Sequence, residues 1–177
     1  MTDITINKVK PNQFAEHLEG LAETLHACVQ EGASVGFVLP FSLDASRQFW
    51  RDAIAPSLES GSNILFVAQS ENDVVGTVQL CCATMPNQPH RADVAKMLVH
   101  PKHQRKGIGR MLLASLESEA RGRGRTLLTL DTRTGDKAEP LYKSVGFEEA
   151  GVIPQFCRAT ESERLDSTTY MYKILKA

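Results

Sequence analysis

The sequence predicts an α/β fold, with a mixed sheet of six to seven strands in one domain over residues 1–177. Two observations indicate this class. Short strand-like runs follow one another through a tight turn in the first half of the chain, and later strands alternate with segments of helical periodicity. A chain of 177 residues also has the length of one domain with a substantial core. No repeat, low-complexity tract or linker divides it.

The N-terminal part predicts one strand and two helices. Ile4 to Lys8 alternates as a short strand, and Asn12 to Glu31 predicts a helix because apolar residues recur every three or four positions. These residues are Phe14, Leu18, Leu21, Leu25 and Val29. The segment Gly32 to Gly36 breaks this helix as a flexible loop. A second helix is expected from about Leu43 to Leu58, interrupted or bent near Pro56.

The middle of the chain predicts a hairpin and a third strand. Asn63 to Gln69 and Val74 to Cys82 form two strands that the turn Glu71-Asn72-Asp73 connects. The polar segment Thr84 to Ala92 predicts a loop. The strand Asp93 to His100 follows that loop.

The C-terminal part alternates helices with strands. Ile108 to Arg121 is amphipathic, and Thr126 to Leu130 predicts an apolar strand that ends at Asp131. A short helix over Ala138 to Val145 ends at Gly146, a residue suited to a left-handed helix cap. The last two strands are expected to pair antiparallel, over Val152–Cys157 and Thr168–Leu175.

Composition narrows the possible partners. The net charge of −1 gives no reason to expect nucleic acid, and no run approaches the roughly 20 apolar residues of a membrane span. We therefore expect a cytoplasmic protein that needs no metal, because the cysteines lack metal-ligand spacing. They are Cys28, Cys81, Cys82 and Cys157. The exposed edges of a sheet are compatible with either a monomer or a homodimer.

A glycine-containing turn between a strand and a helix predicts a phosphate site. It reads Gln104-Arg105-Lys106-Gly107-Ile108-Gly109-Arg110. The first turn of a helix has backbone N–H groups without partners, and the helix dipole favours an anion there. Gly107 and Gly109 would let a pyrophosphate approach the backbone, and Arg105, Lys106 and Arg110 add positive charge.

This turn and a second segment together resemble the GNAT superfamily of acyl-CoA-dependent N-acetyltransferases. The second segment is Leu141-Tyr142-Lys143-Ser144-Val145-Gly146-Phe147. The Q/R-x-x-G-x-G turn and the L/F-Y-x-x-x-G-F segment are diagnostic of that superfamily. The segments 32–37 and 90–94 are also similar to the tabtoxin-resistance acetyltransferases. The resemblance implies the GNAT acyl-CoA N-acyltransferase fold, with helices on both faces of the sheet and a splayed central strand pair.

The resemblance further implies acetyl-CoA as co-substrate. Its pyrophosphate would lie on the amides of Arg105 to Arg110, and its pantetheine would pair with backbone along Met97, Leu98 and Val99. The splay would separate this strand from Leu127 to Leu130. Family members often bind the cofactor through an asparagine before the tyrosine helix, but this chain has Thr134-Gly135-Asp136-Lys137 there.

The implied reaction is attack of a primary amine on a thioester, which requires loss of a proton from the ammonium. Asp93 and Asp131 are the candidate bases, directly or through water, and either could instead bind the substrate ammonium or cap a turn. Tyr142 matches the family tyrosine that protonates or hydrogen-bonds the leaving sulfur; its alternative is a core position.

The acceptor pocket is expected from the N-terminal helices, two loops and the final strands. Ser34, Phe37 and Arg133 are candidate substrate contacts, and the loop 84–92 would narrow the pocket. We expect a small-molecule amine as acceptor, of the amino-acid-like toxin or antibiotic type, and hence a resistance enzyme. The alternatives are a protein or peptide N-acetyltransferase, or a non-catalytic acyl-CoA-binding regulatory module.

Overall fold

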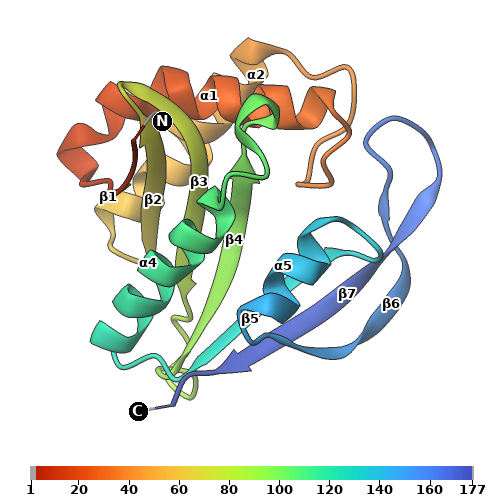
Figure 1. Ribbon diagram of the computed structural model, residues 1–177. Helices are drawn as coiled ribbons and strands as arrows, with labels where there is room; N and C mark the ends of the chain where they lie inside the picture. The colour runs from red at the N-terminus through yellow and green to blue at the C-terminus, as the bar shows by residue number, and fades with distance from the viewer. Residues whose placement is uncertain (1–2, 177) are drawn as a thin grey trace.

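A computed structural model describes residues 3–176, which form a seven-stranded mixed sheet with helices on both faces (Figure 1). The strand order is β1-β2-β3-β4-β5-β7-β6. The strands are β1 (Ile4–Lys8), β2 (Asn63–Ser70), β3 (Asp73–Cys82), β4 (Arg91–Val99), β5 (Leu127–Arg133), β6 (Glu148–Arg158) and β7 (Leu165–Ile174). The helical segments are η1 (Pro11–Gln13), α1 (Phe14–Gln30), α2 (Leu43–Phe49), η2 (Trp50–Ile54), α3 (Ala55–Glu59), η3 (Pro101–His103), α4 (Ile108–Gly122) and α5 (Ala138–Ser144). The predicted mixed α/β sheet is confirmed.

Two apolar cores lie on opposite faces of the sheet. One contains the buried leucines of α4, such as Leu112 and Leu116, together with Tyr142 of α5. The other contains Leu21 and Leu25 of α1 and the fully buried Trp50. Burying one leucine side chain is worth about 1.5–3 kcal/mol, so the apolar faces of α1 and α4 hold both helices on the sheet. Within residues 3–176 no helix is both long and apolar enough to cross a membrane.

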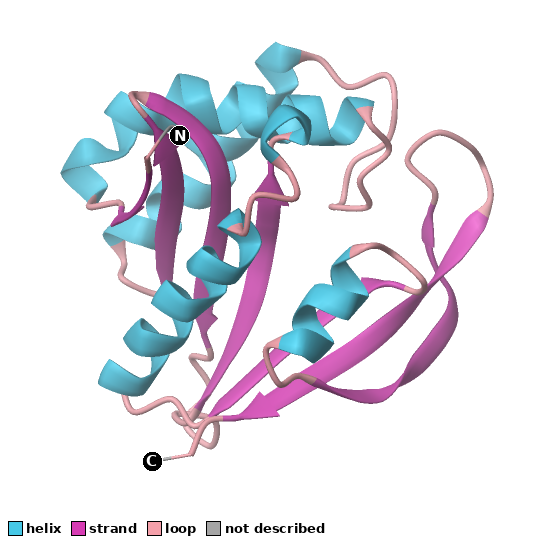
Figure 2. Cartoon of the chain, viewed as in Figure 1, coloured by secondary structure: helices cyan, strands magenta, loops and turns pink. Residues whose placement is uncertain are grey.

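The strands β4 and β5 are parallel neighbours along only part of their length. Their register comprises three pairs, Arg91 with Leu127, Ala92 with Leu128 and Asp93 with Thr129. Beyond Asp93 the two strands diverge, as the V-shaped opening between the magenta arrows shows in Figure 2. The expected splay of the central strand pair is therefore observed. The region between β4 and β5 beyond this last residue pair is called the wedge below.

The C-terminal strands are longer than expected. β5 continues to Arg133 because β7 pairs along its whole length, from Leu127 opposite Ile174 to Arg133 opposite Thr168. Asp131 consequently lies inside a strand, whereas its sequence context predicted the strand end. The antiparallel pairing of β6 with β7 is confirmed, and β7 is inserted between β5 and β6.

The second N-terminal helix is interrupted before the expected position. A π-turn over Trp50–Ile54 separates α2 from α3, and Ala55 N–H donates to the carbonyl of Trp50, five residues back. Pro56 has no N–H to donate and its ring crowds the carbonyl four residues earlier, which accounts for the wider turn before it.

Candidate active site

The junction of β4 and β5 carries one of the two predicted carboxylates. Asp93 stands opposite Thr129 in the last pair of the β4–β5 register, and the Thr129 hydroxyl donates a hydrogen bond to its carboxylate. Arg91 forms an ion pair with the same carboxylate at 3.1 Å. Asp93 therefore lies at the start of the wedge, and the positive charge of Arg91 compensates its negative charge.

The second predicted carboxylate lies farther along the wedge. Asp131 is two residues after Thr129 on β5, so both side chains are on the same face of the sheet. Asp131 is exposed and accepts a hydrogen bond of 3.0 Å from the hydroxyl of Thr168 on β7. The structure thus brings Asp93 and Asp131 to one face of the sheet. Asp131 lies in the part of β5 that no longer pairs with β4.

Tyr142 approaches the wedge from the other face. It lies on α5, is buried in the core on the α4 side, and packs edge-on against Phe147 with ring centroids 5.8 Å apart. Burial raises the pKa of the Tyr142 phenol, and the nearby charges of Asp136 and Asp131 raise it further. The phenol is therefore a proton donor across the physiological pH range. Tyr142 is thus a core residue, and its phenol stays protonated at physiological pH.

The predicted phosphate turn precedes α4 directly. Gly107 is the residue before the helix, with a left-handed φ of +80°, and Arg105 also has a positive φ of +65°. A Cβ atom placed on Gly107 would meet nothing within 4 Å, so the space beside its backbone is open. Arg105 and Lys106 are exposed beside it. An open turn with two cations at a helix start suits a polyanionic ligand.

Gly109 lies where α4 packs against α5. A Cβ atom on Gly109 would lie 2.8 Å from Cδ2 of Leu141. The missing side chain at this position therefore allows α4 to pack against α5.

Other residues of the turn hold it in place. Gln104 donates from Nε2 to the carbonyl of Val99 at 3.1 Å and accepts from Lys137 at 2.9 Å. Arg110 donates to the hydroxyl of Ser144 on α5 at 2.9 Å. The turn is thus fixed to the end of β4 and to both ends of α5 before any ligand binds.

The strand that would carry pantetheine contains a bulge. Lys96 and Met97 both stand opposite Val78, since the register shifts between Thr77 and Gln79 on β3. Leu98 is buried in the core on the α1 side. Met97 and Val99, which flank it, are half-buried against the core on the α4 side.

The three predicted substrate contacts gather around the loop 31–42, which connects α1 with α2. Ser34 Oγ lies 3.7 Å from Cys157 Sγ on β6. Phe37 packs on Phe49, with ring centroids 5.0 Å apart. Arg133, at the end of β5, donates to the carbonyl of Gly32 at 3.3 Å. The structure therefore brings all three to the side where the wedge is open.

The loop 84–92 lies at the opposite end of the wedge, contrary to expectation. It leads into Arg91, where β4 and β5 are still paired, and the carbonyl of His90 accepts from the backbone N–H groups of Thr126 and Leu127. A loop held at the closed junction cannot narrow the open mouth. The loop 31–42 occupies that position instead.

Two polar residues of the wedge were not identified from the sequence. Cys81 is opposite Asp93 in the β3–β4 register, so its thiol is on the same face, and burial raises its pKa to about 11. Lys96 also turns to this face because of the bulge. A lysine inside the apolar run from Val94 to Val99 was the available sequence signal.

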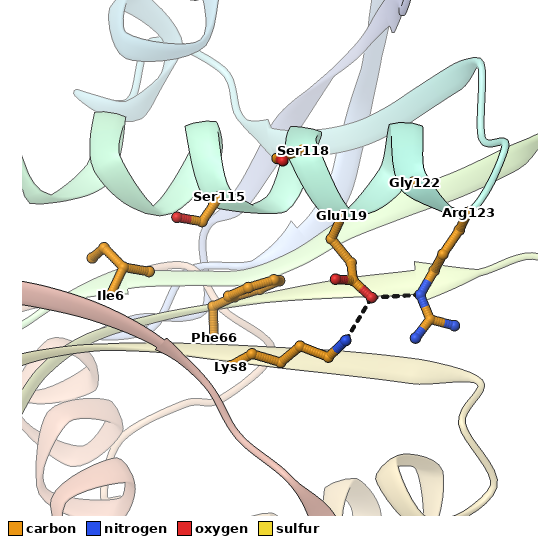
Figure 3. Close-up of a pocket in the computed structure, with 8 residues that line it drawn as sticks. All are labelled: Ile6, Lys8, Phe66, Ser115, Ser118, Glu119, Gly122 and Arg123. Carbon is orange, nitrogen blue, oxygen red and sulfur yellow. Dashed lines mark hydrogen bonds and ion pairs between the residues drawn. The ribbon is translucent and has the colours of Figure 1, made fainter.

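A separate hollow of about 560 Å³ lies between β1, β2 and the C-terminal half of α4. Figure 3 shows Lys8 and Arg123 both bonded to Glu119 there, at 2.8 and 2.7 Å. Burial would raise the pKa of Glu119, but these two hydrogen bonds outweigh it and hold the pKa below its usual value. The hollow is open and two strands removed from β4. We therefore assign the active site to the wedge.

A smaller hollow, of about 440 Å³, adjoins the loop 31–42 and has Arg133 in its lining. Its other lining residues come from the end of α1, the loop 31–42 and the connection between β6 and β7. Among residues 3–176 no three His, Cys, Asp or Glu side chains are grouped so that they could hold a metal ion.

Comparison with known proteins agrees with this geometry. The family profile described as "Acetyltransferase (GNAT) domain" matches residues 61–149, from β2 to the start of β6. An uncharacterised N-acetyltransferase of Azospirillum brasilense is 27% identical over 142 residues, which are 79% of this chain and 82% of that protein. The ribosomal protein bS18-alanine N-acetyltransferase of Salmonella typhimurium is 42% identical over 62 residues, covering 34% of this chain and 42% of that one. The chain therefore spans less than half the length of this second relative.

Solved structures give the same result. The ribosomal-protein-alanine N-acetyltransferase of Brucella melitensis superposes with a TM-score of 0.77 at 25% identity, over 97% of this chain and 99% of that one. The yncA acetyltransferase of Salmonella typhimurium, solved with acetyl-CoA, has a TM-score of 0.77 at 21% identity, over 99% and 95% of the chains. The chain belongs to the GNAT acetyltransferase family, and it is an acyltransferase that uses acetyl-CoA.

Proposed function

We propose that this enzyme transfers the acetyl group of acetyl-CoA to a primary amine of a small molecule, which binds under the loop 31–42 at the open end of the wedge. Transfer is direct, within a ternary complex of enzyme, acetyl-CoA and amine. The observation that carries the proposal is the attachment of this loop to the β6–β7 connection and to the end of β5.

Three hydrogen bonds hold the loop 31–42 in place. Leu39 N–H donates to the carbonyl of Thr160 at 2.8 Å, and the Thr160 hydroxyl donates to the carbonyl of Ala33 at 2.9 Å. Arg133 adds its bond to Gly32. An extended peptide needs an open groove, whereas a loop bonded to the β6–β7 connection and to the end of β5 favours a compact acceptor.

The chain has suitable groups for acetyl-CoA along the wedge. The amides from Arg105 to Arg110 and the exposed side chains of Arg105 and Lys106 would hold the pyrophosphate. The backbone of Met97, Leu98 and Val99 would hold pantetheine, since β5 does not pair with this part of β4. The bound co-substrate supplies a thioester, whose carbonyl carbon accepts the amine.

Side chains of the protein accept and donate the protons of the reaction. Asp93 or Asp131, directly or through water, takes the proton that the ammonium must lose before its nitrogen can attack. A C–N bond forms, the C–S bond breaks, and Tyr142 donates its phenolic proton to the departing sulfur. The second proton that the nitrogen gives up on becoming an amide restores the phenol. The Cys81 thiol, with its raised pKa, stays protonated at neutral pH. This favours direct transfer over an acetyl-cysteine intermediate.

We further propose that the acceptor is an amino-acid-like toxin or antibiotic, and that residues 1–177 act as one acetyltransferase domain. The first inference rests on the likeness of segments 32–37 and 90–94 to tabtoxin-resistance enzymes. The second is supported by β7, which comes from the end of the chain and lies inside the same sheet.

A second candidate is acetylation of a protein N-terminus. The relatives from Brucella melitensis and Salmonella typhimurium are both named as ribosomal-protein-alanine N-acetyltransferases, which favours this activity. The hydrogen bonds that hold the loop 31–42 in place argue against this activity, because a peptide needs an open groove.

Thiol release from acetyl-CoA decides between the two candidates. The purified protein is supplied with small amines, amino-acid analogues and short peptides that begin with alanine. We expect turnover with a small amine and none with the peptides. Turnover with the alanine peptides alone would replace the small-molecule proposal by the second candidate.

A further inference from the structure

The bulge in β4 decides where the Lys96 side chain points. In a regular strand, residues alternate between the faces, so Lys96 would share the face of Val94, which lies in the core on the α4 side. The extra residue opposite Val78 and the positive φ of Lys96, +47°, reverse this arrangement. Its ammonium is directed to the other face, toward the loop 31–42. Non-glycine residues with positive φ are uncommon and often mark functional positions.

The Lys96 ammonium joins three separate parts of the chain. Nζ donates to the carbonyl of Val35 in the loop at 2.9 Å. It also lies 5.6 Å from the ring centroid of Phe37 and 5.2 Å from that of Phe49 on α2, within the range of cation–π attraction. The three bonds through Thr160 and Arg133 fix the loop to the β6–β7 connection and to the end of β5. Lys96 attaches the same loop to β4.

This cation lacks a close counter-ion. Within residues 3–176 no carboxylate lies within 4.0 Å of Lys96 Nζ. Burial lowers the pKa of the ammonium, and the thiol of Cys81 and the carboxylate of Asp131 only partly oppose this effect. A partly buried charge without an ion pair costs stability, and an apolar side chain of similar length would avoid that cost. A lysine at this position therefore has to be explained by function.

We propose that Lys96 is a positioning residue for the acceptor, whose ammonium holds the segment 33–37 against β4 and so shapes the open side of the wedge. This rests on the proposed function in one respect only, that the acceptor binds beneath the loop. Lys96 acts on the acceptor through the loop. Acetyl-CoA, which would bind along the far part of β4 and the start of α4, does not depend on it.

Hydrogen exchange tests the attachment without any substrate. In Lys96→Met we expect amide exchange in the segment 33–37 to rise about tenfold, because a hydrogen bond to a charged donor is lost. The melting temperature should be unchanged or higher, because an uncompensated charge is removed. Lys96→Arg, which keeps the charge and the donors, should protect the segment better than Lys96→Met. Lys10→Met, at an exposed lysine, is the matched control. Unchanged exchange in Lys96→Met overturns the proposal.

Kinetics test the consequence for the acceptor. With any amine from the panel that gives turnover, KM for the amine should rise about tenfold in Lys96→Met, while the Kd for acetyl-CoA stays as in the wild type. A joint loss of melting temperature, acetyl-CoA binding and kcat would mean a merely structural role and would overturn the proposal. If no amine of the panel is acetylated, the proposed function fails, and the exchange experiment still decides whether Lys96 holds the loop.

Discussion

Thr129 donates a hydrogen bond to Asp93 across the last residue pair that joins β4 to β5. This bond, with the ion pair to Arg91, occupies the Asp93 carboxylate at the point where the wedge begins. Asp131 has one side-chain donor, Thr168, and lies in the open part of the wedge. The two carboxylates that the sequence left equivalent are therefore in different environments.

Asp131→Asn should lower kcat by about 10²-fold, because we infer that this freer carboxylate is the base. Its melting temperature should stay near the wild-type value, since the side chain is exposed. Asp93→Asn should lower both kcat and the melting temperature, because Arg91 loses its ion-pair partner. Steady-state kinetics and thermal melting of both variants provide the check. A wild-type kcat in Asp131→Asn would leave Asp93 as the base.

Gly107→Glu should abolish acetyl-CoA binding. Two unit charges 4 Å apart near a protein surface repel each other by about 4 kcal/mol, and about 1.4 kcal/mol already lowers affinity tenfold. Calorimetric titration with CoA measures the loss. Gly107→Asn is the control for backbone strain, because asparagine tolerates a left-handed φ and carries no charge. Wild-type affinity in a folded Gly107→Glu protein would exclude the phosphate site at this turn.

Gly109→Glu should instead destabilise the protein. Its Cβ would lie 2.8 Å from Cδ2 of Leu141, so the Leu141 side chain has to leave its packed position between α4 and α5. Overpacking of this kind costs about 1–3 kcal/mol, which denaturant unfolding can resolve. Equal stability of Gly109→Glu and Gly107→Glu would show that the two glycines do not differ in role.

Tyr142→Phe should lower kcat by roughly 10²-fold and leave the Kd for acetyl-CoA largely unchanged. Phenylalanine keeps the buried ring and its edge-on contact with Phe147, and only the proton donor is lost. Single-turnover kinetics separate this chemical step from binding. A wild-type rate would reduce Tyr142 to a core residue.

The thiol of Cys81 should react slowly with iodoacetamide at neutral pH, with a rate that rises until about pH 11, because only the thiolate is nucleophilic. The free energy of unfolding should fall as the pH rises over the same range. Between the ordinary thiol pKa of 9.0 and about 11 the native state keeps a proton that the unfolded state has lost, so unfolding becomes easier as the pH rises. Peptide mapping after alkylation at several pH values provides the measurement. Rapid labelling of Cys81 at pH 7 would contradict the assignment and reopen an acetyl-cysteine intermediate.

Local patterns were sufficient for most elements of the fold. The periodicity of α1 and α4, the hairpin turn at 71–73 and the cap at Gly146 act over a few residues, so the order of strands and helices could be predicted. The turn between β4 and α4 was predictable for the same reason, since a strand, two glycines and a helix start are contiguous. The end of β5 was not predictable, because it depends on pairing with β7, some 40 residues later.

The sequence by itself determined the family, the co-substrate and the residue types that acid–base chemistry requires. Only the tertiary structure decided that Asp93 is held at the junction by Thr129, that Gly109 serves packing against Leu141, and that a bulge turns Lys96 toward the loop 31–42. It also placed the loop 84–92 at the paired junction of β4 and β5, away from the loop 31–42. Each of these depends on contacts between segments far apart in the chain, for which a single sequence carries no local signal.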